Sequence, residues 1–214
     1  MKVYSILVHP ERQSLNGALF DTALAHFRSK KYQFETLDLY RSEFNPWGVY
    51  NEVTADTQTD NYAHKWFAAD ARGLLPKFSQ QEIEKIKDSD VLYIQTPIWW
   101  WGLPSIMKAY IENVFIYNVL FSLDNEASTE PNSSTVFKFL RGKKLVLSIT
   151  TGSSEQFMIE HFGSVDAMLA PIKARFSFLG YDVLPVYHGL GLSHESNAED
   201  RISNFRQYLN STLS

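Results

Sequence analysis

The stretch that decides the fold is VLYIQTPIWWWGLP, residues 91–104. Its first residues are apolar and partly β-branched, which is typical of a strand covered on both faces. Three adjacent tryptophans follow, and Pro104 suits the first turn of a helix. A buried strand that passes through a short loop into a helix is the repeating unit of a parallel sheet with helices on both faces.

The same pattern recurs along the chain. Apolar runs predict further strands at residues 3–8, 34–39, 144–151 and 182–187, and helical spacing follows at 15–27, 103–115, 165–179 and 197–213. The motif Ser79-Gln80-Gln81-Glu82 predicts a helix capped by Ser79 that runs through Lys87. We therefore predict an α/β fold, a flavodoxin-like doubly wound five-stranded parallel sheet in the order 2-1-3-4-5.

The length and composition are those of one globular domain. The chain has 214 residues, 44% of them hydrophobic and 21% charged, so we expect a single domain over residues 1–214. Two segments are too long or too polar for ordinary connections. Residues 41–78 are rich in aromatic side chains, and residues 124–135 are polar, so we expect a mobile loop there.

Several classes of function are excluded by composition. With no cysteine, the chain cannot use disulfides, iron–sulfur clusters or thiol chemistry. A net charge of −4 gives no basic face for nucleic acid, and no histidine spacing indicates a metal site. The longest apolar stretch, residues 114–123, is half the length of a membrane span. Residues 3–8 lead into His9-Pro10 without a small-residue cleavage site, so we expect a cytoplasmic protein.

Ligands of such sheets bind beyond the carboxyl ends of the strands, which directs attention to the loops at 9–16, 96–103 and 150–163. The first loop runs directly into a helix, whose free N–H groups are suited to phosphate. Ser14, Asn16 and His9 can add hydrogen bonds there. The alternative is that Ser14 only caps the helix and His9 is an ordinary loop residue.

The second and third loops are suited to a flat heterocycle. Trp99, Trp100 and Trp101 cannot all point into one core, since successive residues of an extended chain face opposite sides. An indole left at the sheet edge needs a cover such as a planar cofactor or a partner subunit, although core packing with a dimer contact is the alternative. Thr150 to Ser154 supply hydroxyl and N–H groups for the polar edge of a ring.

In combination, these segments resemble the NAD(P)H:quinone oxidoreductase family of flavodoxin-like flavoproteins, over nearly the whole chain. The residues that carry the resemblance are His9-Pro10, Ser14-Leu15-Asn16, Phe44-Asn45-Pro46, Pro97 to Pro104, Lys108, Glu112, Val114-Phe115, Leu147 to Gly152 and Asp200-Arg201. The resemblance implies an NAD(P)H dehydrogenase (quinone) that holds FAD, with FMN less favoured. It also implies a homodimer with its active sites at the interface, which would explain segment 41–78 as a subunit contact.

The resemblance assigns roles residue by residue. The groups holding the flavin dinucleotide would be His9, Ser14, Leu15, Asn16, Ala18, Pro97, Ile98, Trp99, Trp100, Trp101, Thr150, Thr151, Gly152, Ser153 and Arg201. The nicotinamide and the quinone would stack in turn on a floor near Trp100, Trp101 and Gly152. Phe157 or Met158 stands where family members have a tyrosine, which puts Phe157 on the substrate side. His161 is the candidate catalytic histidine, although an alignment shift of one residue would replace it with Phe162.

The leading hypothesis is therefore two-electron hydride transfer from NADPH or NADH to a quinone or similar flat acceptor, through one pocket used twice, with ping-pong kinetics. A second hypothesis is a non-catalytic flavin-binding protein, either the regulatory subunit of a potassium-efflux system or an electron carrier. A third is a flavin-free α/β binding protein.

Overall fold

The parallel sheet has the predicted strand order. A computed structural model of the chain describes residues 1–46, 62–117, 119–124, 135–191 and 198–213. Four strands lie in the order β2-β1-β3-β6, and two short strands complete the edge beside β6. The strands are β1 (Lys2–Leu7), β2 (Gln33–Asp38), β3 (Val91–Pro97), β6 (Lys144–Thr150), β7 (Asp182–Val183) and β8 (Tyr187–Gly189). The predicted flavodoxin-like topology is thereby confirmed.

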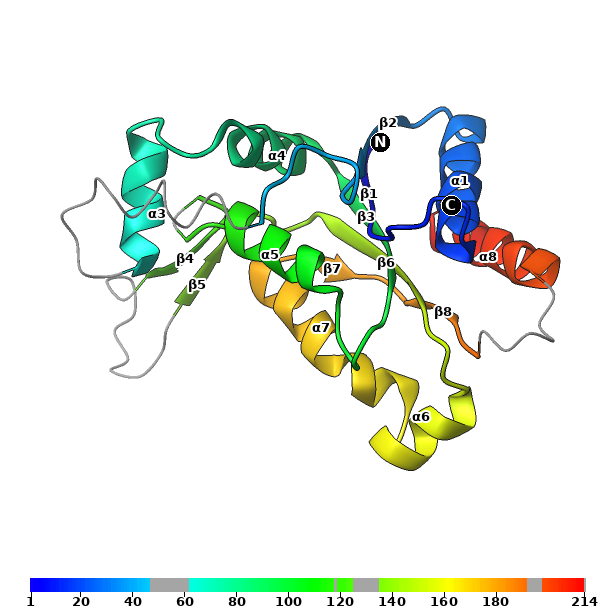
Figure 1. Cartoon of the computed structure of the whole chain (residues 1–214). Helices are drawn as coiled ribbons and strands as arrows, with labels where there is room; N and C mark the ends of the chain where they lie inside the picture. Colours follow the sequence, from blue (N-terminus) through cyan, green and yellow to red (C-terminus); the bar gives the residue numbers. More distant parts are fainter. Residues whose placement is uncertain (47–61, 118, 125–134, 192–197, 214) are drawn as a thin grey trace.

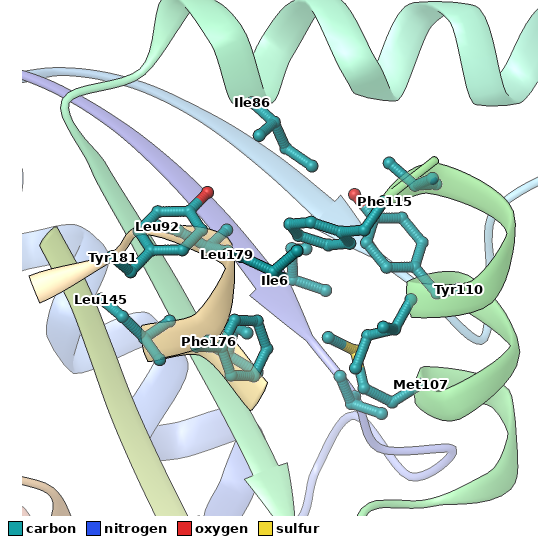
Figure 2. Close-up of a cluster of buried hydrophobic side chains, with 14 of the residues drawn as sticks. Ile6, Ile86, Leu92, Met107, Tyr110, Phe115, Leu145, Phe176, Leu179 and Tyr181 are labelled. Atoms are coloured by element: carbon teal, nitrogen blue, oxygen red, sulfur yellow. The ribbon is translucent and has the colours of Figure 1, made fainter. Parts of the chain in front are cut away.

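Helices cover both faces of the sheet (Figure 1). On one face lie α1 (Leu15–Ser29) and α8 (Ala198–Thr212), which pack against each other over one apolar core. On the other face lie α4 (Lys77–Asp88), α5 (Ser105–Val114), α6 (Glu155–Phe162) and α7 (Val165–Leu179). Figure 2 shows part of this second core, where Ile6 of β1 lies among side chains from α5 and α7.

Two features of the sheet differ from the prediction. The expected fifth strand, 182–187, is divided into β7 and β8, because its register with β6 shifts by one residue: Val183 lies opposite Leu145, but Tyr187 lies opposite Ser148. An antiparallel pair, β4 (Phe121–Asp124) with β5 (Thr135–Lys138), was not predicted. Residues 125–134, where we expected a mobile loop, lie outside the described residues.

The predicted capping role of Ser79 is wrong. Helix α4 begins two residues earlier, with Pro76 at its N-cap, so Ser79 lies inside the first turn. Its hydroxyl is buried without a hydrogen-bond partner. Glu82 does not cap the helix either: its carboxylate is 1% exposed, accepts hydrogen bonds from the hydroxyls of Tyr4 and Tyr110, and pairs with Lys85.

The aromatic segment 41–78 is partly core structure. It contains α3 (Tyr62–Ala71), and the side chain of Trp66 is only 6% exposed because it packs into the core of the same chain. Trp47 and Tyr50 lie outside the described residues. Trp66 at least is therefore needed for intramolecular packing rather than for contact with another subunit.

We predict that stability depends on pH through His188 of β8. Burial lowers the pKa of His188 below its ordinary 6.5, and its Nε2 is buried without a hydrogen-bond partner. The folded state resists a proton that the unfolded state binds, so this stability is complete above pH 6.5 and declines as the pH falls below it. The thermal midpoint, measured from about pH 8 to about pH 5, should fall less steeply in His188→Gln than in the wild type. Parallel pH profiles would contradict this assignment.

Candidate flavin site at the strand tips

The three loops selected from the sequence meet at the carboxyl ends of β1, β3 and β6. The backbone N–H of Ile98 donates to the carbonyl oxygen of Thr150 at 2.8 Å, and the rings of His9 and Trp99 lie 5.9 Å apart between centroids. Between the second and third loops lies a cavity of about 430 Å³, a size typical of small-molecule sites. Its lining consists of Ile98, Trp99, Trp100, Trp101, Thr151, Gly152 and Ser153.

The tryptophan loop is a strained two-residue turn. Trp99 and Gly102 exchange backbone hydrogen bonds of 2.9 and 3.0 Å, which closes the turn around Trp100 and Trp101. Both central residues have positive φ, 50° and 60°. This is the type I′ pattern, which favours Asn-Gly, and each bulky residue in it costs about 1–3 kcal/mol. Tryptophan nevertheless occupies both positions, although a positive φ is unfavourable for a bulky side chain.

The turn leaves its indoles accessible to solvent. Trp100 is 96% exposed, while Trp99 and Trp101 are 41% and 46% exposed. Neither pure core packing nor ordinary surface chemistry accounts for three adjacent exposed indoles. The three indoles instead form an apolar wall of the cavity, whose lining also includes Thr151, Gly152 and Ser153.

Two side chains of α6 extend this wall into a column of stacked rings. Phe157 stacks on Trp101 at 5.4 Å between centroids, and His161 stacks on Phe157 at 3.9 Å. The carbonyl oxygen of Phe157 lies 2.9 Å from Nδ1 of His161, so Nδ1 carries the proton in that hydrogen bond. His161 is exposed and does not line the cavity, whereas Phe162 contacts Trp101 directly.

The first loop holds the ring of His9 through Nδ1. This nitrogen lies 3.0 Å from the backbone nitrogen and 2.9 Å from the carbonyl oxygen of Glu11, and 3.0 Å from Oγ of Ser14. These contacts within the loop occupy Nδ1, so Nε2 is the ring nitrogen left for a ligand. Ser14 also caps α1 by accepting from the N–H of Gly17. The N–H groups of Leu15 and Asn16, in the first turn, have no acceptor within the helix.

Gly17 is required by the protein itself. A Cβ at this position would lie 1.9 Å from the carbonyl oxygen of Arg12, whose guanidinium donates to the carbonyl of Gly17 at 3.1 Å and pairs with Asp21. The loop from His9 to Ser14 is thus folded tightly against the start of α1.

We expect Gly17→Ala to displace this loop. Because the clash is with backbone atoms, the loop must move as a whole, and overpacking of this kind costs about 1–3 kcal/mol of unfolding free energy. Urea unfolding of the purified variant measures the loss. Ala18→Ser, one residue along the same helix, serves as the control. A Gly17→Ala variant as stable as the wild type would contradict the tight approach of Arg12.

Three arginines at this edge are used to brace the loops. Arg12 holds the start of α1 as described, and Arg41 donates to the carbonyl of Pro10 at 3.0 Å while pairing with Asp38. Arg201 donates to the carbonyls of Leu190 and Gly191 at 2.7 and 2.6 Å. An anion bound at these strand ends would therefore accept hydrogen bonds from N–H and hydroxyl groups rather than from these guanidinium groups, which already donate to backbone carbonyls.

Gly152 differs from Gly17 because no protein contact requires it. A Cβ on Gly152 would meet no protein atom within 4 Å, and the backbone there does not need positive φ. The residue lines the cavity, and a side chain at this position would stand in open space. This is the feature expected of a surface against which a flat ring lies.

The structure thus brings together most of the residues predicted from the sequence. Pro97 ends β3 opposite Thr150, and Ala18 follows in α1. The side chain of Asn16 is buried and directed into the protein, where it bonds Thr150 and Gln95. Gln95 was missed, although a glutamine inside an otherwise apolar strand was the available signal.

Among the described residues, no cluster of acidic or histidine side chains could hold a metal, and no helix has the length and apolar character for a membrane crossing.

Comparisons with known proteins agree with this architecture. The profile of the flavodoxin-like fold family matches residues 1–213. The chain is 28% identical to rat NAD(P)H dehydrogenase [quinone] 1 over 84% of its length and 65% of the rat protein. It is 27% identical to a ribosyldihydronicotinamide dehydrogenase-like protein of Penicillium crustosum, over 97% of this chain and 79% of that protein. A solved structure from Klebsiella pneumoniae, 24% identical, superposes with a TM-score of 0.85 over 99% of this chain and 84% of that chain.

Proposed function

We propose, from the premise that this chain belongs to the flavodoxin-like fold family, that it is an oxidoreductase of the NAD(P)H dehydrogenase (quinone) type, with FAD as its prosthetic group. The observation that carries the proposal is the cavity lined by three accessible indoles and by Thr151, Gly152 and Ser153. Such a slot is suited to flat rings of low charge.

The residues present fit a flavin dinucleotide. Trp99, Trp100 and Trp101 would line the ring system, and the groups of Thr151 to Ser153 would hydrogen-bond its polar edge. The open space over Gly152 leaves room for the ring. Nε2 of His9 and the free N–H groups of Leu15 and Asn16 would bond the diphosphate at the start of α1. Held there, FAD would supply hydride transfer between NAD(P)H and a quinone.

The chain's own contribution is positioning and electrostatics. The indole wall, supported by Phe157, presents flat molecules face to face. The N–H groups of Thr151 and Ser153 already donate to the carbonyl of Gly189 and to Oγ1 of Thr151. The hydroxyls of Thr151 and Ser153 and the N–H of Gly152 are therefore the donors that would stabilise negative charge at the ring edge. Because one slot receives the nicotinamide and then the quinone, the two substrates exclude each other. We therefore expect ping-pong kinetics.

His161 and Arg201 receive supporting roles in this proposal. His161 is separated from Trp101 by Phe157, so we assign it the support of the stacked rings, with Phe157 and Phe162 nearer to the substrate side. Arg201 holds the loop of Leu190 and Gly191, and the N–H of Gly191 in turn donates to the carbonyl of Ser153 at 2.8 Å. It would therefore act on the cofactor site through the third loop.

The proposal includes a homodimer. Trp100 is 96% exposed, so the described part of its own chain leaves most of the indole uncovered, and a second subunit over the cavity mouth would supply a cover. Sedimentation of the purified protein at several concentrations tests this point. A monomer at all concentrations would oppose it.

The experiment for the function itself uses the purified full chain. The flavin released by heat is identified against FAD and FMN, and NADH and NADPH oxidation is then followed with menadione. Parallel double-reciprocal lines support the proposal, and intersecting lines oppose the shared slot. Bound flavin without turnover would favour the regulatory-subunit or carrier hypothesis, and no flavin binding would favour the flavin-free one.

A further inference from the structure

A chain of buried polar side chains runs beneath the candidate site. The hydroxyl of Tyr93 donates to Oε1 of Gln95 at 2.7 Å, and Nε2 of Gln95 donates to Oδ1 of Asn16 at 2.9 Å. Nδ2 of Asn16 then donates to Oγ1 of Thr150 at 2.8 Å. None of the four side chains is more than 3% exposed. Their polar groups are therefore bonded to one another and not to solvent.

Three members of this chain stand at the boundaries of the site loops. Asn16 lies in the first turn of α1, immediately after the loop from His9 to Ser14. Gln95 lies two residues before Pro97, where β3 gives way to the tryptophan loop. Thr150 is the last residue of β6, next to the third loop. The backbone of Gln95 also accepts from the N–H of Val8, at the end of β1.

We propose that Asn16 and Gln95 are positioning residues, which fix the three site loops relative to one another from below through Thr150, without their side chains touching the cofactor. This inference rests on the proposed flavin function. It changes the role assigned to Asn16 from the sequence, since an amide already bonded to Gln95 and Thr150 is not available to a phosphate.

The chemistry of the side chains supports this role. Asn16 must both accept from Gln95 and donate to Thr150, which an amide does and a carboxylate or an aliphatic side chain does not. Buried polar groups are costly unless every member is bonded, so a complete network favours one arrangement of its elements over others. The backbone hydrogen bonds between neighbouring strands end where the strands end. The side-chain network adds a connection at this point, because it joins β3 and β6 to α1 through Asn16.

The test is a double-mutant cycle on flavin affinity with Gln95→Leu and Thr150→Val, which remove the bonds on either side of Asn16. Each single variant is expected to raise the dissociation constant of FAD about tenfold, and the double variant also about tenfold rather than about a hundredfold, because either change breaks the same link. Thr150→Ser keeps the hydroxyl and should restore wild-type affinity. Ile86→Val, a core change in α4 away from the site, controls for general loss of stability.

Amide hydrogen exchange of the flavin-free protein gives a readout that does not depend on the cofactor. In Gln95→Leu, the N–H groups of Gly17, Ile98 and Thr151, one in each connected segment, should all exchange faster, whereas in Ile86→Val they should not.

Additive effects on the dissociation constant, or faster exchange at Ile98 alone, would overturn the inference. If the wild type binds neither FAD nor FMN, the proposed function fails, and the exchange experiment alone then decides whether the three loops are coupled.

Discussion

Gly152→Val is expected to abolish flavin binding, with a dissociation constant for FAD at least about a hundredfold above that of the wild type, while the flavin-free protein keeps its stability. The reason is that Gly152 lines the cavity and that a Cβ at this position meets no protein atom within 4 Å. The valine side chain would occupy the space against which the ring lies. Titration of the flavin-free protein with FAD, followed by flavin fluorescence, measures the constant.

Two further variants make this result interpretable. Gly152→Ala adds one carbon to the same space and should cause an intermediate loss. Ala174→Val makes a similar change on the exposed side of α7 and should leave flavin affinity unaltered. A Gly152→Val variant that binds FAD like the wild type would show that the ring does not lie over this residue.

The second large effect concerns the strained turn. Replacing Trp100 with Asn and Trp101 with Gly gives the sequence that type I′ turns favour, so we expect the unfolding free energy to rise by about 1–2 kcal/mol. Two of the three indoles of the cavity wall are lost in the same variant. We therefore expect kcat/KM for menadione to fall about a hundredfold, with urea unfolding and steady-state kinetics as the measurements.

The matched control for this variant keeps the rings and the strain. Trp100→Phe with Trp101→Phe retains aromatic faces at both positions and the positive φ values, so both stability and turnover should stay near those of the wild type. A less stable Asn-Gly variant would show that the turn is not strained. An Asn-Gly variant with full activity would show that these indoles are not part of the substrate slot.

The backbone architecture could be predicted from the sequence because its signals are local. The apolar runs of β1, β3 and β6 and the helical stripes of α1, α5 and α7 fix the alternation, and the alternation fixes the sheet order. The position of the site follows from that order, because ligands bind where the direction of winding reverses. The loops at 9–16, 96–103 and 150–163 could therefore be selected before any contact was known.

The features that were missed depend on contacts between distant segments. Glu82 resembles a capping residue in sequence, but in space it lies between Tyr4 and Tyr110. Gln95 is an isolated polar residue until α1 brings Asn16 to it. The positive φ of Trp100 and Trp101 opposes their intrinsic preference and results from the hydrogen bonds between Trp99 and Gly102. The split of the last strand is a one-residue register shift against β6, which depends on pairing between distant segments.

The most direct test of the central claim is the visible absorption of the purified protein during one reductive and one oxidative half-reaction. The chain saturated with FAD is mixed anaerobically with one equivalent of NADH or NADPH, and menadione is added afterwards. We predict that the protein-bound flavin absorption disappears with the first reagent and returns fully with the second, and that both changes are lost in Gly152→Val. A wild-type chain that binds no flavin, or whose bound flavin keeps its absorption when NADH or NADPH is added, would contradict the assignment of the indole-walled cavity as a hydride-transfer site.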